Sequence, residues 1–313
     1  MATYEPRIDW LREQLRSLNE QTYPNLCLYV RDDASSETSY KRIKQALKAC
    51  ITAFPFELHQ NSYNLGSTMT FEQLTREAEG DYFAYCDQDD VWLPDKLEQF
   101  EKKLRERKNA ALVCSDMYIV DQTGEIVADS ITKIRRHHRL RSGENLAEGL
   151  LFSNFVTGCA MMVRAEQAKA AIPFCPYMFH DHYLAFCCAR IGEIALIQRP
   201  LIRYRIHGAN QSRDVAGVSD KESYYRLRIE QTEKRLRWLC ARFGAEKKLG
   251  ASLTKGLRWI EARKKYFLNG SDMITVWKYR RFERNTALFE LISRLLSPKM
   301  FMALIELKRG NKI

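Results

Sequence analysis

Three of the four residues in Asp87-Gln88-Asp89-Asp90 are carboxylates, and this segment gives the clearest indication of chemistry in the sequence. The three charges repel one another unless something positive lies among them. In an extended backbone, residues two apart face the same side, so we expect Asp87 and Asp89 to converge and Asp90 to point away. Mg²⁺ and Mn²⁺ prefer oxygen ligands and need few protein groups where substrate phosphates supply the rest. The segment predicts half of such a cation site; the alternative is a solvated acidic turn before the helix near Pro94.

Two further acidic positions lie at the ends of expected elements. Asp32-Asp33 closes a strand, where a carboxylate can accept a hydrogen bond from the imide N–H of a pyrimidine base or, alternatively, can cap the next helix. His180-Asp181-His182 begins a helix, so Asp181 is a candidate general base whose flanking imidazoles tune its pKa or fix its orientation. The alternative is an N-capping Asp between two surface histidines. A zinc site is disfavoured because neither following cysteine has a usual ligand spacing.

His207 lies at the end of the strand-like segment 194–206. An imidazole at a loop edge there can close over a metal or a diphosphate, and nearby arginines such as Arg205 can pair with phosphate oxygens. A merely structural histidine is the alternative interpretation.

The elements that must position these residues alternate along the chain. Apolar residues at helical spacing predict helices near residues 8–18, 43–51 and 69–78, and apolar runs predict strands at 26–31, 56–59 and 82–86. This alternation predicts an α/β fold with a mostly parallel sheet flanked by helices. Ligands of such sheets bind beyond the carboxyl ends of the strands. Polar residues follow three successive strands here, so we expect the site at that edge.

Charge divides the chain into two parts. Residues 221–313 carry 23 Lys and Arg against 9 Asp and Glu, a net charge of +14, whereas residues 1–220 carry a net charge of −3. Beyond residue 220 the pattern becomes charged, amphipathic helix. We therefore expect one domain over 1–220 and a basic helical extension over 221–313.

The cysteine content and the apolar segments of the sequence indicate the cellular compartment of the protein. The nine cysteines are scattered without a CxxC pair, which suits a reducing compartment. The longest apolar run, Met300 to Ile305, is far shorter than the roughly 20 residues of a membrane-spanning helix. No secretion signal is visible at the start. We expect a cytoplasmic protein.

Five ordered motifs together resemble glycosyltransferase family 2, which has the GT-A fold. They are Thr3-Tyr4-Glu5-Pro6, Gln21-Thr22-Tyr23-Pro24-Asn25, Arg31-Asp32-Asp33-Ala34-Ser35, Asn64-Leu65-Gly66 and Asp87 to Pro94. With His180-Asp181-His182 and Tyr204 to Gly208, the chain looks most like bacterial rhamnosyltransferase-type members. The resemblance covers about residues 1–215.

The resemblance implies roles for individual residues. Thr3, Glu5 and Gly66 would line the nucleotide site, Asp33 would contact the base, and Asp87 would meet the ribose or the metal shell. Asp89 would bind Mn²⁺ or Mg²⁺ directly, and His207 would contact the metal or the diphosphate. Asp181 would be the catalytic base of an inverting enzyme. The partners implied are a nucleotide-sugar donor and a glycan acceptor in cell-surface polysaccharide synthesis, with dTDP-rhamnose as the preferred donor and a UDP-hexose as the alternative.

Three features depart from the family pattern. Members usually have a full strand before the Thr-Tyr pair and an Asn where Glu5 stands, so we expect the first, normally central strand to be missing and the true start to lie upstream. His180 replaces the usual acidic neighbour of the catalytic Asp. The Gln-x-x-Arg-Trp motif of processive synthases is absent from the sequence, so we expect single-sugar addition.

The basic extension permits two further interpretations. Apolar residues at 288, 291, 292, 295 and 296 form a helical stripe that continues after Pro298, with Arg280, Arg281 and Arg284 nearby. We expect either a helix on an anionic membrane, which would place the enzyme at the inner face of the plasma membrane beside a lipid-linked acceptor, or helices packed on the protein. A nucleic-acid-binding protein is the rival from another class; with no such motif in the sequence, we expect no nucleic-acid partner.

Overall fold

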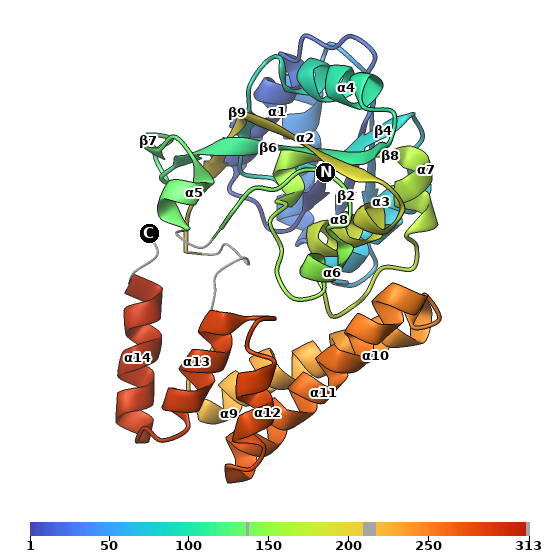
Figure 1. The fold of residues 1–313 in the computed structure, drawn as a ribbon. Coiled ribbons are helices and arrows are strands. Elements are labelled where there is room, and N and C mark those ends of the chain that lie inside the picture. The colour runs from blue at the N-terminus through green and yellow to red at the C-terminus, as the bar shows by residue number, and fades with distance from the viewer. Residues whose placement is uncertain (136–137, 209–216, 311–313) are drawn as a thin grey trace. The chain divides into compact units, whose positions relative to one another are not determined.

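A computed structural model describes residues 1–135, 138–208 and 217–310. Contacts divide the chain into two units, the first comprising Met1–Ala147 and Asn154–His207 and the second comprising Glu148–Ser153 and Gly208–Ile313. The first unit alternates helices with the strands of two sheets, whereas the described part of the second has helices and no strand (Figure 1).

The smaller sheet is wholly parallel, as the alternation of elements predicts. Its order is β1 (Ala2–Thr3), β2 (Leu28–Asp32) and β3 (Phe56–Gln60), with α1 (Ile8–Asn19) and α2 (Glu37–Cys50) as the connections. Helix α1 forms where Leu11, Leu15 and Leu18 recur on one face, and all three are buried. The strand that we expected to be missing is present as two residues, of which Thr3 pairs with Asp32.

The larger sheet is mixed. Its strands are β4 (Tyr82–Ala84), β5 (Val91–Trp92), β6 (Ala110–Val120), β7 (Ile126–Ala128), β8 (Met161–Arg164) and β9 (Glu193–Arg205), with the main order β4-β8-β6-β9-β5. Only β6 and β9 run parallel among the pairings of its described residues. The α/β prediction is confirmed, but the expectation that segment 82–86 extends a parallel sheet is wrong, because β4 pairs antiparallel with β8. The apolar pattern of a strand indicates that the strand is buried. It does not indicate whether the neighbouring strand runs parallel or antiparallel to it.

The remaining helical elements between the strands follow in order along the chain. They are α3 (Ser67–Glu77), α4 (Lys96–Glu106), α5 (Ile131–Ile134), α6 (Ala147–Leu150, which runs into the second unit), the 3₁₀ turn Gly158–Ala160, α7 (Ala165–Ala170) and α8 (His180–Ile191). Leu11 and Leu15 of α1, Ile43 of α2, Phe100 of α4 and Ile119 of β6 share one fully buried core. This core holds the ends of the strands that carry the site.

The second unit is built from α9 (Lys221–Tyr224), a π-helical turn (Tyr225–Glu230), α10 (Gln231–Phe243), α11 (Lys247–Asn269), α12 (Met273–Lys278), α13 (Arg284–Ser293) and α14 (Pro298–Gly310). The apolar stripe of the sequence begins in α13 and continues, through the residues that connect the two helices, into α14. Phe301 and Ile305 of α14 are buried, whereas Ile292 and Leu295 are 57% and 75% exposed, so the stripe packs within the unit only in part. None of the helices in the described ranges is long and apolar enough to cross a membrane.

A buried ion pair joins α11 to α13. Arg263 and Glu290 are both 1% exposed, and Arg263 Nε donates to Glu290 Oε2 over 2.7 Å. The hydroxyl of Tyr224 donates to Glu290 Oε1 over 3.0 Å. Removing one partner of such a pair leaves an uncompensated charge in the interior.

We expect Glu290→Ala to lower the free energy of unfolding by about 3–5 kcal/mol, because the guanidinium of Arg263 then remains buried without its carboxylate. Replacing both residues together, Arg263→Met with Glu290→Met, should recover most of this loss. Urea denaturation measures both values. Glu37→Ala, which breaks the exposed Lys41–Glu37 pair, is the control and should cause no measurable change. Equal effects of Glu290→Ala and Glu37→Ala would contradict the prediction.

Candidate active site

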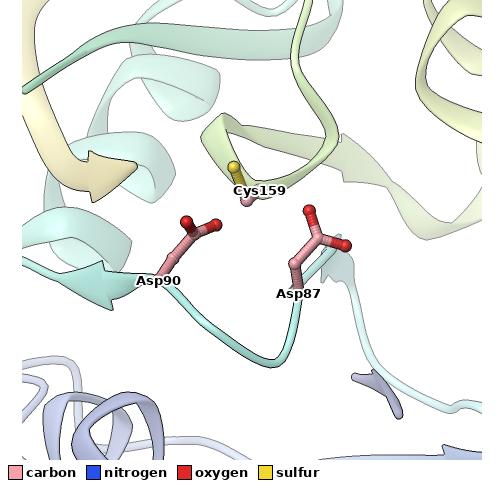
Figure 2. Close-up of side chains that lie close together, drawn as sticks. All are labelled: Asp87, Asp90 and Cys159. Carbon is pink, nitrogen blue, oxygen red and sulfur yellow. The ribbon is translucent and has the colours of Figure 1, made fainter. Parts of the chain in front are cut away.

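The turn Asp87–Asp90 connects β4 to β5 and gathers carboxylates differently from the sequence prediction. Figure 2 shows Asp87 and Asp90 projecting from the turn to the same side, where Cys159 lies, and one ligand atom from each of the three lies within 4.8 Å of the others. The expectation that Asp90 points away is therefore wrong. Strand β4 ends at Ala84, so the backbone of the turn is not extended and side chains do not alternate there.

Lys96, which sequence analysis did not single out, compensates this negative charge from the first residue of α4. Its side chain is fully buried, its ammonium donates to the carbonyl of Cys159, and it lies 3.3 Å from the ring centroid of Trp92. Burial lowers the pKa of Lys96 to about 8, and Asp90 and Asp87 are among the negative groups that act against this shift. Burial also raises the pKa of Asp90 well above its ordinary value. A buried lysine beside two carboxylates holds the turn in place.

Arg205, at the end of β9, fixes the same turn from the other side. Its backbone N–H donates to Asp90 Oδ1 over 3.0 Å, and its Nε donates to the carbonyl of Asp89 over 2.9 Å. Its guanidinium also pairs with Glu13 of α1. The side chain is 1% exposed, so it positions the turn and is not available to phosphate, which the sequence had suggested for this arginine.

Asp89 and His207 face each other at the edge of this cluster. His207 Nε2 lies 2.6 Å from Asp89 Oδ2, and the two side chains are 13% and 18% exposed. The ring of Trp10 packs 4.9 Å from the imidazole, which orients it. The structure thus brings together the two residues predicted as metal contacts, although they are 118 positions apart.

Two groups of side chains are candidates for a cation. In the first, Asp87 with Asp90 and Cys159, burial raises the thiol pKa well above its ordinary value, and Lys96 already supplies positive charge. A protonated thiol is a poor ligand. In the second, Asp89 with His207, a carboxylate oxygen and an imidazole nitrogen converge at a partly exposed position, which fits a divalent metal with substrate oxygens completing its coordination. The second group fits the predicted cofactor better.

The loop after β2 is organised by Asp32 and Asp33. Asp32 Oδ1 accepts from the hydroxyls of Thr3 and Ser35 over 3.1 and 2.6 Å. Asp33 Oδ1 accepts from Asn61 Nδ2 over 2.8 Å and from the N–H of Leu65 over 2.7 Å. Asp33 is 4% exposed and Thr3 is 2% exposed. Their side chains therefore hold the loops of the expected nucleotide site, and a base contact by Asp33 remains a proposal.

Glu5 and Gln88 connect that loop to the acidic turn. Glu5 has a φ of +39°, its N–H donates to Ser35 Oγ over 2.8 Å, and its Oε1 accepts from the N–H of Ser36 over 2.6 Å. This last hydrogen bond lowers the pKa of Glu5. The backbone of Tyr4 exchanges two hydrogen bonds with the side-chain amide of Gln88, of 2.8 and 3.2 Å. The predicted residues Thr3 and Glu5 thus flank Tyr4, whose backbone is linked to the turn that carries Asp87 and Asp89.

Gly66 begins α3 in a conformation open almost only to glycine. Its φ is +79° and its ψ is 158°. In this conformation its N–H donates to Asp33 Oδ2 over 2.9 Å. Asn64 completes the closure by donating from Nδ2 to the carbonyl of Asp33 over 3.2 Å. The predicted nucleotide-site residues Asp33 and Gly66 therefore form one hydrogen-bonded loop pair.

Asp181 lies in the first turn of α8, partly exposed. Its Oδ2 accepts from the N–H of Gly158 over 3.0 Å, and its Oδ1 accepts from Asn154 Nδ2 over 3.3 Å and from the N–H of His182 over 2.5 Å. Burial raises its pKa from 3.8 to about 6. Burial also raises the pKa of Asp87 to about 7, with the charges of Asp89 and Asp181 adding to the effect. The predicted base therefore shares the electrostatic field of the acidic turn.

His180 and Gly158 shape the surroundings of Asp181. His180 is buried against Phe71, with ring centroids 3.9 Å apart, and burial lowers its pKa to about 3. The neutral ring adds no positive charge beside Asp181, and it is not the surface histidine of the alternative interpretation. A Cβ on Gly158 would lie 2.6 Å from His180 Nε2, so glycine is required there. Sequence analysis did not single out Gly158.

Comparison with known proteins shows the family of the chain. The family described as Glycosyl transferase family 2 matches residues 1–166. The chain belongs to this family. It is 25% identical over 285 residues to an uncharacterized glycosyltransferase of Nostoc sp., an alignment that covers 87% of this chain and 83% of that protein. It is 24% identical over 249 residues to the dTDP-rhamnosyl transferase RfbG of Shigella flexneri, covering 72% of this chain and 78% of the relative. The protein is a glycosyltransferase.

Solved structures confirm the GT-A fold. TarS 1-349 of S. aureus in complex with UDP superposes with a TM-score of 0.54 and 16% identity, covering 99% of this chain and 86% of that one. The mannosyltransferase PcManGT of Pyrobaculum calidifontis, in complex with GDP-Man and Mn²⁺, gives a TM-score of 0.52 and 14% identity, covering 99% and 78%. This glycosyltransferase therefore has the fold that the motifs predicted.

If Asp181 is the base that the sequence predicts, its carboxylate must be deprotonated to accept a proton, and we expect kcat/KM to fall about tenfold per pH unit below about pH 6 and to be level above it. A pH–rate profile of donor turnover measures this, and Asp181→Asn should remove turnover. His180→Phe is the control: it keeps the ring packing on Phe71 and should leave the acid limb in place. An acid limb near pH 4, or one that moves with His180→Phe, would contradict the assignment.

We expect Gly66→Ala to raise the donor KM about tenfold, because a side chain disfavours this backbone conformation by about 1–3 kcal/mol and so disturbs the hydrogen bond to Asp33. Gly143→Ala is the matched control, since Gly143 also has a positive φ with open space around its missing Cβ. Steady-state kinetics should show an unchanged KM for this control. The same KM in both variants would argue against a nucleotide site at the Asp33 loop.

Proposed function

We propose that this glycosyltransferase moves one sugar from a nucleotide donor to a glycan hydroxyl with inversion, using a divalent cation at Asp89 and His207 and Asp181 as the base. The convergence of Asp89 Oδ2 and His207 Nε2 over 2.6 Å carries the proposal. The charges of Asp89 and Asp181 both raise the pKa of Asp87, which supports it because the proposed metal ligand and the proposed base then act on the same residue.

Asp89 and His207 would hold Mn²⁺ or Mg²⁺ together with the diphosphate of the donor. When bound, the cation neutralises the charge that develops on the leaving nucleoside diphosphate. The Mn²⁺ and GDP-Man bound to the mannosyltransferase of Pyrobaculum calidifontis support a divalent metal here. Lys96 and Arg205 fix the turn that carries Asp89, so the metal-binding carboxylate is oriented before the substrate arrives.

Asp181 would take the proton from the attacking acceptor hydroxyl. Its oxygens are held by Asn154 and by the N–H of Gly158, which fix the direction in which the carboxylate accepts. A raised pKa near 6 makes it a better base than an ordinary aspartate while leaving it ionised at neutral pH. Attack opposite the leaving diphosphate inverts the anomeric centre in one displacement and requires no covalent enzyme intermediate.

The preferred donor is dTDP-rhamnose. The relation to the dTDP-rhamnosyl transferase RfbG supports it. A UDP-hexose is the alternative, which the UDP bound to TarS supports. In either case Asp33, held between Asn61 and the N–H of Leu65, is the proposed contact of the pyrimidine base, and Asp87 that of the ribose. The proposed acceptor is a glycan of a cell-surface polysaccharide, in lipid-linked form.

A panel of nucleotide sugars incubated with the full chain and Mn²⁺ or Mg²⁺ tests this function. We expect nucleoside diphosphate release from one donor, dTDP-rhamnose, and its loss on addition of a chelator. Asp89→Ala should lower release about 100-fold or more, because a charge-stabilising group is lost. Glu37→Gln, at an exposed carboxylate of α2, is the control and should retain full activity.

Two outcomes would contradict the proposal. Turnover that survives both the chelator and Asp89→Ala would remove the metal assignment. Turnover of a UDP-hexose in place of dTDP-rhamnose would contradict the proposed donor but not the proposed mechanism.

A further inference from the structure

Helices α11 and α12 expose apolar side chains on either side of the turn that connects them. Leu268 is 65% exposed, Met273 53%, Ile274 79% and Trp277 48%. Single exposed apolar residues are ordinary on a protein surface, but several within ten residues of one turn are not. We refer to these four residues as the α12 tip.

Helix α12 explains why the group faces outward. Val276 is fully buried and packs with Ala262, Tyr266 and Ala287, so it provides the inner face of this short helix. Ile274 and Trp277 lie one and four positions after Met273, so the three side chains share the outer face of the helix. Only the inner face of α12 packs against the rest of the unit. If only water contacted the outer face, we would expect polar residues there.

Positive charge surrounds the α12 tip. Residues 264–284 contain six Lys and Arg against two Asp and Glu, a net charge of +4. The guanidinium of Arg280 lies 4.1 Å from the ring centroid of Trp277 and donates to its carbonyl over 2.8 Å. Lys278 and Arg281 are exposed beside it. Tryptophan next to cations is typical of side chains that lie at the boundary between lipid headgroups and acyl chains.

We propose that the α12 tip inserts into the surface of an anionic phospholipid bilayer. The apolar side chains enter the acyl boundary and the surrounding cations contact lipid phosphates. The complementary charge favours this occupant over a second copy of the chain, whose α12 tip would be equally positive. The attachment suits the lipid-linked acceptor proposed above, but its evidence is independent of the transferase mechanism.

The location differs from the one that the sequence indicated. In the region 287–307, Phe301 and Ile305 of the continued stripe are buried in the second unit, whereas Ile292 and Leu295 are 57% and 75% exposed, so only part of the stripe is core. Truncation near residue 280 would also remove Glu290, the partner of buried Arg263, and would destabilise the unit. Single substitutions at the α12 tip are therefore the informative test.

Cosedimentation of the full chain with phosphatidylcholine vesicles, with and without about 30% phosphatidylglycerol, tests the proposal. We expect binding to the anionic vesicles, and Ile274→Asp should weaken it about tenfold or more. Ile191→Asp is the matched control, because Ile191 is 59% exposed in the other unit, and it should bind as the unchanged protein does. Lys278→Glu should weaken binding and Lys48→Glu, exposed on α2, should not.

Nucleoside diphosphate release should be equal in Ile274→Asp and the unchanged protein, which shows that the variant folds and separates this test from that of the transferase mechanism. Met273→Ser, a milder change on the same face, should give a smaller loss of vesicle binding. The proposal is overturned if anionic vesicles do not bind, or if Ile274→Asp and Ile191→Asp bind equally. It is also overturned if Ile274→Asp changes only the self-association measured by sedimentation velocity.

Discussion

Repulsion among the three carboxylates of the Asp87–Asp90 turn is the constraint on which the rest of the site depends. Two residues from distant elements act on the turn: Lys96 of α4 supplies positive charge near Asp87 and Asp90, and Arg205 of β9 donates from its backbone N–H to Asp90 and from its guanidinium to the carbonyl of Asp89. Both are buried, so their charges act through a medium that screens them weakly. Arg205 holds the inner part of the turn, and Asp89 faces His207 at its partly exposed edge.

A second set of buried hydrogen bonds prepares the neighbouring loops. Asp32 and Asp33 accept from residues of the first strand and of the loop after β3, so each carboxylate ties two chain segments that the sequence separates by about thirty positions. The amide of Gln88 extends this network to the acidic turn. Loops held in this way lose little freedom when a ligand binds, which favours affinity. The same design recurs at Asp181, whose oxygens are held by Asn154 and Gly158.

Short sequence patterns predicted the features that depend on neighbouring residues in the chain. Apolar spacing located α1 and the parallel strands β2 and β3, and the motifs identified the family and its fold. Patterns did not predict the antiparallel pairing of β4 with β8, because the direction of a partner strand is a property of the whole sheet. Nor did they reveal Lys96, which reads as one more charge on a charged helix until its burial is seen. The inward direction of Asp90 was missed because the turn breaks the alternation that an extended chain would show.

The central claim is that the cation site lies at Asp89 and His207 and not at Asp87, Asp90 and Cys159. Titration of Mn²⁺ into the protein with dTDP, followed by the electron paramagnetic resonance signal of free Mn²⁺, tests it directly. The account predicts that His207→Ala weakens Mn²⁺ binding by tenfold or more, about the loss typical of one ligand or its support, whereas Cys159→Ala leaves it unchanged. Mn²⁺ binding that is lost in Cys159→Ala and kept in His207→Ala would contradict it.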